Sequence, residues 1–346
     1  MRRGIQALLV IVVMVSLPVF WLFRAPAALP ARFAPEDCAR LALTDTATGQ
    51  PVVGVEDIAP LPDGDTMILS ALDRLALRRR PQSAREGGLY QVSLARLAAG
   101  DGWARPLVPA GSIAGGLRPH GIAVSDDGER LALVNRARDG TTSIIVGALG
   151  SGAFSPRHAR TDAAFCRAND LDFTGTGPMT LRVTLDRADC GVAWADLRPG
   201  ASTGRVIRLD LAGGGAPEVE TGGLSFANGI AGLWVAETRA SRLHHLLDRP
   251  VPLPGGPDNL TWDERGGLVT ALHPSMLQIA AYLFGYSGSA PTRVVRVAPD
   301  RGVEVLVDDP HGDVFAGATV AVLRGGVLVA GSAADAGVMV CRKGGA

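Results

Sequence analysis

Six segments of the chain share one pattern, and this internal repeat limits the possible folds more than any other feature of the sequence. In each segment a polar cluster precedes an apolar residue, which is usually followed by a turn and a β-rich run. The segments begin at Val55, Pro119, Ala168, Phe226, Pro257 and Gly317. Asp63-Gly64 and Asp127-Gly128 are strong hairpin signals, and Arg265-Gly266-Gly267 and Arg324-Gly325-Gly326 are comparable turns.

The spacing of the repeat indicates a propeller. Equivalent positions in the six segments are Asp57, His120, Asn169, Asn228, Asp258 and Ala318, at steps of 63, 49, 59, 30 and 60 residues. Most of these steps suit a four-stranded blade with its loops, whereas the step of 30 predicts a trimmed blade. Further strand-like runs lie between the markers at 88–94, 142–148, 204–211 and 293–297. With 44 Gly and 23 Pro available for turns, the sequence predicts an all-β, six-bladed β-propeller.

The N-terminus carries a targeting signal. Arg2 and Arg3 precede an apolar run from Ile5 to Phe23, which is about the length needed to cross a bilayer. We expect a transmembrane signal-anchor helix within residues 1–30 and the propeller over residues 31–346. Ala25-Pro26-Ala27 resembles a cleavage site, so a cleaved signal peptide is the alternative. Both interpretations place the propeller outside the cytoplasm, on the periplasmic or extracellular side, either anchored in the membrane or secreted.

The four cysteines fit an oxidising compartment. Cys38 lies where the repeats begin and Cys341 where they end, while Cys166 and Cys190 lie 24 residues apart in the middle. Of the three possible pairings, these positions favour Cys38–Cys341 and Cys166–Cys190, with free buried thiols as the alternative. A disulfide between the first and last strands would close the ring of blades.

Polar side chains recur at the same step of five repeats. They are Glu56, Asp57, His120, Asn169, Asp170, Asn228, Asp258 and Asn259. A single Asn or Asp beside a turn usually reflects turn chemistry, but turn chemistry does not require this alignment. Innermost strands line the central tunnel of a propeller, so a ring of oxygen ligands is expected there. Such a ring suits calcium better than zinc, which prefers His and Cys, or magnesium, which needs stricter octahedral geometry.

The overall charge gives no sign of a nucleic-acid partner. The chain has 34 Lys and Arg residues and 34 Asp and Glu residues, which leaves a formal net charge of zero. A nucleic-acid-binding domain usually carries a strong basic excess. The expected partners are therefore a small-molecule substrate and, through the N-terminal segment, a membrane.

The motifs of the repeats resemble those of the paraoxonase/arylesterase family. VEDI, PHGI, ND, FANGI, DN, the HP pair at His273-Pro274 and GATVA occur here in the family's order, over roughly Cys38 to Cys341. The family consists of six-bladed propellers that hold two calcium ions in the tunnel. By resemblance, the catalytic calcium would be held by Glu56, Asn169, Asn228, Asp258 and Asn259. The structural calcium would be held by Asp57, Asp170 and the backbone carbonyl of Ile122. Cys38–Cys341 matches the family's ring-closing disulfide, whereas Cys166–Cys190 has no counterpart there.

The resemblance implies a calcium-dependent hydrolase of lactones or aryl esters. Calcium would polarise the ester carbonyl, and His120 would act as general base, although a lone His beside Pro and Gly is often structural. The family pairs this histidine with a second one, but Arg136 stands at that position. Arginine cannot relay a proton at neutral pH, so Arg136 would instead bind an anionic substrate or the oxyanion. His273 matches a histidine near the family's active site and would assist.

Other functions remain open at this stage. Arg136 and the trimmed blade favour a non-catalytic, calcium-stabilised propeller that acts as a binding or scaffold protein at the membrane surface. The gluconolactonase-like propellers usually bind one metal, whereas the pairs Glu56-Asp57 and Asn169-Asp170 favour two metals. The strictosidine-synthase-like propellers lack the ring of oxygens. Two further segments bear on the pocket: Arg78–Arg80, expected in a loop near its mouth or simply solvated, and Ser275–Phe284, expected as a wall over it or as a buried strand.

Overall fold

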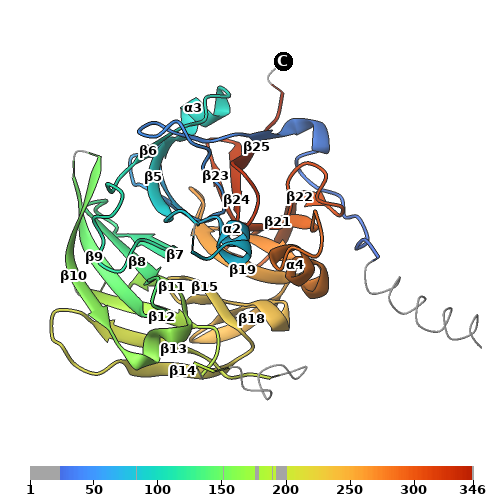
Figure 1. Ribbon diagram of the computed structural model, residues 1–346. Coiled ribbons are helices and arrows are strands. Elements are labelled where there is room, and N and C mark those ends of the chain that lie inside the picture. The colour runs from blue at the N-terminus through green and yellow to red at the C-terminus, as the bar shows by residue number, and fades with distance from the viewer. Residues whose placement is uncertain are drawn as a thin grey trace, which may run out of the picture.

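The computed structural model describes residues 24–82, 84–150, 152–175, 179–188, 190–191 and 201–344. These residues form six antiparallel sheets arranged around a common centre, as the blades of a propeller (Figure 1). The innermost strands, in chain order, are β3 (Val55–Pro60), β7 (Pro119–Val124), β11 (Ala168–Phe173), β15 (Ala227–Ala231), β19 (Gly256–Trp262) and β23 (Ala318–Arg324). All six positions that marked the repeat lie on these strands. The prediction of an all-β, six-bladed propeller is therefore confirmed.

Each blade continues outward from its innermost strand through three more strands. In the order of the six blades, these are β4 (Thr66–Ala71), β5 (Gly88–Ser93) and β6 (Trp103–Pro106); β8 (Arg130–Arg136), β9 (Thr142–Gly150) and β10 (Ala153–Thr161); β12 (Thr180–Leu185), β13 (Gly204–Asp210) and β14 (Glu218–Leu224); β16 (Trp234–Glu237), β17 (Arg242–His245) and β18 (Asp248–Pro252); β20 (Leu268–His273), β21 (Thr292–Val297) and β22 (Val303–Asp309); β24 (Val327–Ser332), β25 (Val338–Arg342) and β1 (Cys38–Leu41). The short β2 (Thr44–Asp45) extends the first blade by parallel pairing with β6.

The fourth blade corrects one expectation. The short step after Asn228 predicted a trimmed blade, yet β15 to β18 form a complete four-stranded sheet. The step is short because these strands have only four or five residues each and are joined by tight connections. The short step between the fourth and fifth repeats therefore reflects short strands and connections rather than a missing strand.

The ring closes by combining both ends of the propeller in one blade. Strand β1 pairs antiparallel with β25, with Cys38 opposite Cys341. The two residues form a disulfide across a sequence separation of 303 residues. A second disulfide joins Cys166 and Cys190. Both predicted pairings are confirmed, and they suggest an oxidising, extracytoplasmic environment for the chain.

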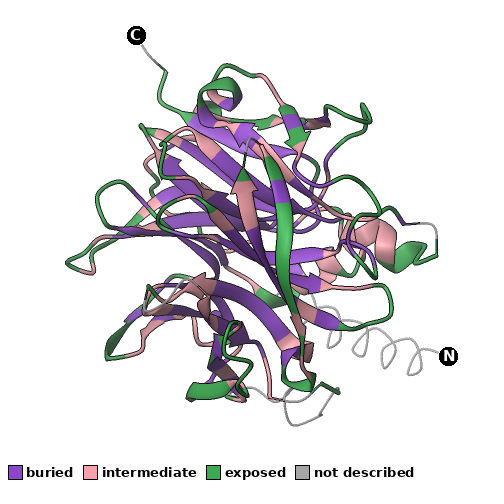
Figure 2. Ribbon diagram, turned by 90° about the vertical axis from the view of Figure 1, so that its left-hand side faces the viewer, coloured by how far each residue is buried: buried purple, intermediate pink, exposed green. Residues whose placement is uncertain are grey.

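The core lies between the blades. Strand β8 buries consecutive residues from Leu131 to Asn135, and β4 buries Met67 to Ala71. Both faces of such strands are covered because each blade is packed between two neighbours, so the usual alternation of apolar and polar residues is lost. Figure 2 shows the buried residues concentrated in the strands, and the exposed residues mainly in the connecting loops and in outermost strands such as β10 and β14.

Two helices lie over one end of the tunnel. Helix α2 (Arg74–Arg79) lies near the centre of the ring, with α4 (Met276–Leu283) beside it (Figure 1). Arg78 joins them, because its guanidinium donates to the Leu283 carbonyl and stacks 4.3 Å from the Phe284 ring centre. Arg78 and Arg79 therefore end a helix rather than lie in a loop, and the segment before Phe284 is helical rather than a buried strand. Elsewhere lie α3 (Leu94–Ala98) and the 3-10 turns η1 (Pro35–Asp37), η2 (Ala163–Arg167) and η4 (Thr238–Ala240).

The predicted membrane segment, up to Phe23, lies outside the described residues, so the signal anchor and the division at residue 30 stay predictions. Within the described part of the chain, no helix has the length and apolarity required to span a bilayer. Residues from 24 onward contact the propeller. The Arg24 carbonyl accepts from Gln278, and the Leu29 amide donates to Asp308 at 2.6 Å.

Candidate functional site

The innermost strands bring the predicted polar residues together at the tunnel. Glu56 and Asp57 lie on β3, His120 and Ile122 on β7, Asn169 and Asp170 on β11, Asn228 on β15, and Asp258 and Asn259 on β19. All of them are buried. At this level every innermost strand carries an irregularity in its pairing register with the next strand. A bulge re-aims side chains, so the aligned polar residues of the repeat coincide with aligned bulges.

Several side-chain oxygens in this ring have no hydrogen-bond partner within the described part of the chain. They are Oδ1 of Asn169, Asp170, Asn228, Asp258 and Asn259. Buried polar atoms are almost always satisfied by a protein group, a water or an ion. For Asn259 the cause is visible, because its Nδ2 donates to the Glu56 carbonyl at 2.9 Å and leaves Oδ1 free. Unpartnered acceptors of this kind are what an oxygen-ligated cation requires.

The chemistry of the donor set fits calcium through its amides. Among the described residues, no group of three or more His, Cys, Asp and Glu side chains could hold a metal ion. The site therefore depends on the oxygens of Asn169, Asn228 and Asn259, which calcium accepts alongside carboxylates. Zinc, which selects His and Cys, does not fit such a set.

Asp57 and Asp170 form the deeper part of the ring. Asp57 accepts from the amides of Ile58 and Ile122, both at 2.8 Å, and Asp170 accepts from the Ile230 amide at 2.9 Å. Burial, together with repulsion from neighbouring carboxylates, raises the pKa of Asp57 to about 7 and that of Asp170 well above its usual range. Two desolvated carboxyl groups that repel each other form a site that a divalent cation would stabilise.

Glu56 is bound by a residue that the sequence did not single out. The Arg74 guanidinium and His120 Nδ1 both contact one Glu56 carboxylate oxygen. Burial alone would raise the pKa of Glu56, but the charge of Arg74 and the contact with His120 lower it to about 2. Arg74 begins helix α2, whose N-cap is Asp73. The Asp73 cap is a helix signal in the sequence, but the fold of α2 over the tunnel is what brings Arg74 to Glu56.

The tunnel environment sets the protonation state of His120. Burial and the charge of Arg136 lower the pKa of His120 to about 4, despite the opposing effect of Glu56. The imidazole is therefore neutral at pH 7, and its Nδ1–H donates to Glu56. Because Nδ1 carries that proton, the 2.9 Å approach of Arg74 to the same atom is not a second hydrogen bond. In this tautomer Nε2 is the unprotonated nitrogen.

The other two predicted catalytic residues have different surroundings. His273 is buried, and its Nε2 lies 2.7 Å from Asp258 Oδ2. This contact places His273 behind a predicted metal ligand, where it can orient the Asp258 carboxylate. Arg136 donates to the Ala168 carbonyl at 2.7 Å, while its Nε is buried with no partner among the described groups.

A cavity of about 230 Å³ adjoins the ring beneath α2. Its described lining consists of Leu72, Arg74, Leu77, Arg78, Arg118, Pro119, His120, Arg136 and Ala137. His120 and Arg136 thus face one pocket, whereas His273 is not part of its described lining. A larger cavity of about 560 Å³ lies beside the first blade but contains no member of the oxygen ring. We therefore regard the smaller cavity as the candidate substrate site.

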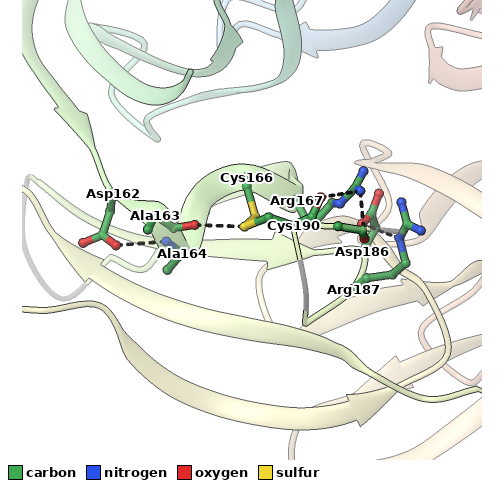
Figure 3. Close-up of a disulfide and its surroundings, with 9 residues drawn as sticks. Asp162, Ala163, Ala164, Cys166, Arg167, Asp186, Arg187 and Cys190 are labelled. Carbon is green, nitrogen blue, oxygen red and sulfur yellow. Dashed lines mark hydrogen bonds and ion pairs between the residues drawn. A yellow bond between two sulfur atoms is a disulfide. The ribbon is translucent and has the colours of Figure 1, made fainter. Parts of the chain in front are cut away.

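The Cys166–Cys190 disulfide, shown with its surroundings in Figure 3, lies close to this site along the chain. Cys166 belongs to η2, which leads directly into β11 and Asn169, and Cys190 follows β12. Next to the disulfide, Arg167 donates to the Cys190 carbonyl at 2.7 Å, and Arg187 Nε lies 3.6 Å from Asp186 Oδ1 (Figure 3). The disulfide thus links the turn η2, which precedes the innermost strand β11, to the connection that follows the neighbouring strand β12.

Comparison with known proteins supports the fold. No protein-family model and no curated protein matches the chain. A gluconolactonase from Xanthomonas campestris is similar in structure, with a TM-score of 0.51 at 17% identity, covering 92% of this chain and 99% of the other. A second protein, provisionally assigned as a gluconolactonase, has a TM-score of 0.49 at 15% identity and coverages of 92% and 97%. At this identity the likeness shows a shared fold, the six-bladed propeller of gluconolactonase-like proteins, and the paraoxonase-like assignment stays a prediction.

Proposed function

We propose that this protein is a calcium-dependent hydrolase of small lactones or aryl esters. The observation that carries the proposal is the ring of five buried, unpartnered side-chain oxygens beside a pocket that contains a neutral histidine. The proposed catalytic calcium is held by Glu56, Asn169, Asn228, Asp258 and Asn259, and the structural calcium by Asp57, Asp170 and the Ile122 carbonyl. The gluconolactonase named above, which shares the fold, makes lactones the first substrates to try.

The residues of the chain have distinct tasks in this proposal. Calcium, when bound, supplies a Lewis acid for the ester carbonyl and a counter-charge for the developing oxyanion. Glu56 accepts a hydrogen bond from the Nδ1–H of His120, so that the unprotonated Nε2 can remove a proton from the attacking water. Arg136 keeps its charge and adds positive potential to the pocket. His273 holds Asp258 and acts as a positioning residue.

The test is a panel of five- and six-membered lactones and phenyl acetate, assayed with calcium and after calcium removal. We expect hydrolysis only with calcium. Asn228→Ala and Asn259→Ala should abolish it more completely than His120→Ala, because loss of a general base typically costs about 10²–10⁴-fold, whereas loss of a ligand removes the electrophile. Asn135→Ala is the matched control, because the Asn135 amide is already satisfied by the Arg118 amide and the Gly116 carbonyl. It should keep the calcium affinity of the wild type in a calorimetric titration.

A second candidate rests on Arg136, which occupies the place of a second histidine and cannot relay protons. A non-catalytic, calcium-stabilised binding or scaffold protein would titrate with calcium but hydrolyse nothing in the panel. Arg136→His separates the two functions further. A gain of ester hydrolysis would mean that the missing histidine limits an enzyme, and no hydrolysis by either protein would favour the scaffold.

A further inference from the structure

The pocket beside the oxygen ring is strongly cationic. Four arginines line it, namely Arg74, Arg78, Arg118 and Arg136, and its described lining contains no Asp or Glu. The remaining lining is His120 and the apolar Leu72, Leu77, Pro119 and Ala137. Since the whole chain has a net charge of zero, this concentration of positive charge is a local feature.

The arginines are only partly neutralised by the protein. Arg74 pairs with Glu56, and Arg136 interacts with the charges of Asp186 and Glu56. Arg78 contacts a backbone carbonyl and an aromatic ring rather than a carboxylate. Arg118 is half-buried, and its side chain has no hydrogen bond or ion pair to any described residue. Holding such like charges together is unfavourable unless a ligand offsets their repulsion.

Two of these side chains also carry buried donors without acceptors. Arg74 Nη1 and Arg136 Nε have no hydrogen-bond partner among the described groups. In the adjoining ring the unpartnered atoms are acceptor oxygens, whereas here they are N–H donors. Arginine donors in a fork geometry match the paired oxygens of a carboxylate or a phosphate.

We propose that the substrate carries an anionic group, a carboxylate or a phosphate, which Arg118 and Arg136 bind while its ester or lactone carbonyl faces the oxygen ring. This inference rests on the proposed function for the reaction and goes beyond it in naming the substrate class. The apolar lining, Leu72 and Leu77 among it, contacts the short carbon chain between the two groups. Arg118 is a specificity-determining residue in this arrangement.

Binding of anions tests the proposal without turnover. Calcium-loaded protein is titrated calorimetrically with glutarate and with glycerol 3-phosphate, and with their neutral counterparts glutaramide and glycerol. We expect at least one anion to bind and neither neutral compound to do so. Arg118→Gln should weaken anion binding about 10- to 100-fold, the usual value of a charge-assisted hydrogen bond. Arg80→Gln, which removes an exposed arginine outside the pocket lining, should leave it unchanged.

A matched pair of esters extends the test to catalysis. Monophenyl glutarate should have a lower KM than phenyl pentanoate, and Arg118→Gln should remove that preference. Anion binding that Arg118→Gln and Arg136→Gln leave intact would mean that the anion binds calcium or another site, and would overturn the inference. Equal KM values for the two esters would overturn it as well and leave the proposed hydrolase standing. Arginine-dependent anion binding without hydrolysis of any ester would support the anion site and refute the proposed reaction.

Discussion

At the scale of single residues, Arg74 is the feature that most changes the expected site. Its guanidinium contacts the Glu56 carboxylate, and both side chains are largely buried. A calcium ion ligated by Glu56 must compete with this internal cation, because the two positive charges cannot share the carboxylate without strong repulsion. The chain therefore contains its own competitor for the proposed metal.

We expect Arg74→Met to raise the calcium affinity by about tenfold or more. The reason is that repulsion between two positive charges a few ångströms apart costs more free energy than a shift of about one pKa unit, which corresponds to a factor of ten. Calorimetric calcium titration measures this change. Arg79→Met is the control, because Arg79 lies on the same helix and is exposed outside the pocket lining. After calcium removal, Arg74→Met should melt below the wild type, since it leaves Glu56 buried without its ion pair. Unchanged calcium affinity would show that Arg74 and calcium do not compete.

The sequence predicted some of these residues and not others for identifiable reasons. The polar residues of the ring, from Glu56 to Asn259, recur in phase because each innermost strand repeats the same bulge. Arg74 and Arg118 lie outside the repeated motif, and a tertiary fold, not a local pattern, brings them to the pocket. Arg136 was identified only because it stands where the family that the sequence resembles has a histidine.

At the scale of elements, the site depends on how closely the innermost strands approach one another. A Cβ atom added to Gly121 on β7 would lie 2.3 Å from Asp170 Oδ1, and one added to Gly229 on β15 would lie 2.5 Å from the Asp258 carbonyl. Real Cβ atoms do not approach other atoms this closely, so these glycines allow neighbouring blades to meet at the ring.

We expect Gly121→Ala to push β7 away from β11, to lower the melting temperature and to weaken calcium binding. Gly222→Ala on the outer strand β14 is the control, because its added Cβ has its nearest neighbour at 3.9 Å. Thermal melts and calcium titrations of both variants test this. Should Gly121→Ala bind calcium like the wild type, the close approach of the strands would be unimportant for the ring.

The ends of the elements also differ in how far the local sequence predicts them. The Asp-Gly turns located the hairpins of the first two blades, because Gly64 and Gly128 supply the positive φ that such turns need. The segment Ser275–Phe284 was expected as a wall over the pocket or as a buried strand, although Ser275 caps helix α4 by accepting from the Gln278 amide at 3.3 Å. Its apolar residues pack under the loops of the last blades, and this packing cannot be inferred from spacing.

At the scale of the whole molecule, the proposed calcium ions should couple the blades that would supply their ligands. When calcium is removed, the raised pKa values of Asp57 and Asp170 mean that the folded protein binds protons that the unfolded chain releases. Stability must then fall as the pH rises from about 4 through about 7. The depressed pKa of His120 has the opposite effect, but only below about pH 6.5.

We therefore expect calcium to raise the melting temperature by many degrees, and to raise it more at pH 8.5 than at pH 6.5. Protein depleted of calcium on a chelating resin, melted with and without added calcium or magnesium, tests this expectation, because ligand binding stabilises only the folded state. Magnesium should restore less stability than calcium. An identical melt with and without calcium at both pH values would refute the calcium sites.

The closing blade also dictates the order of events during synthesis. Strand β1 is made among the first of the propeller, but its partner β25 follows 303 residues later. At about 5–20 residues per second, β1 waits roughly 15 to 60 s for that partner. Throughout this time its edge is open to pairing with other chains, and Cys38 is without its native disulfide partner. The ring-closing disulfide can therefore form only after the last blade has emerged.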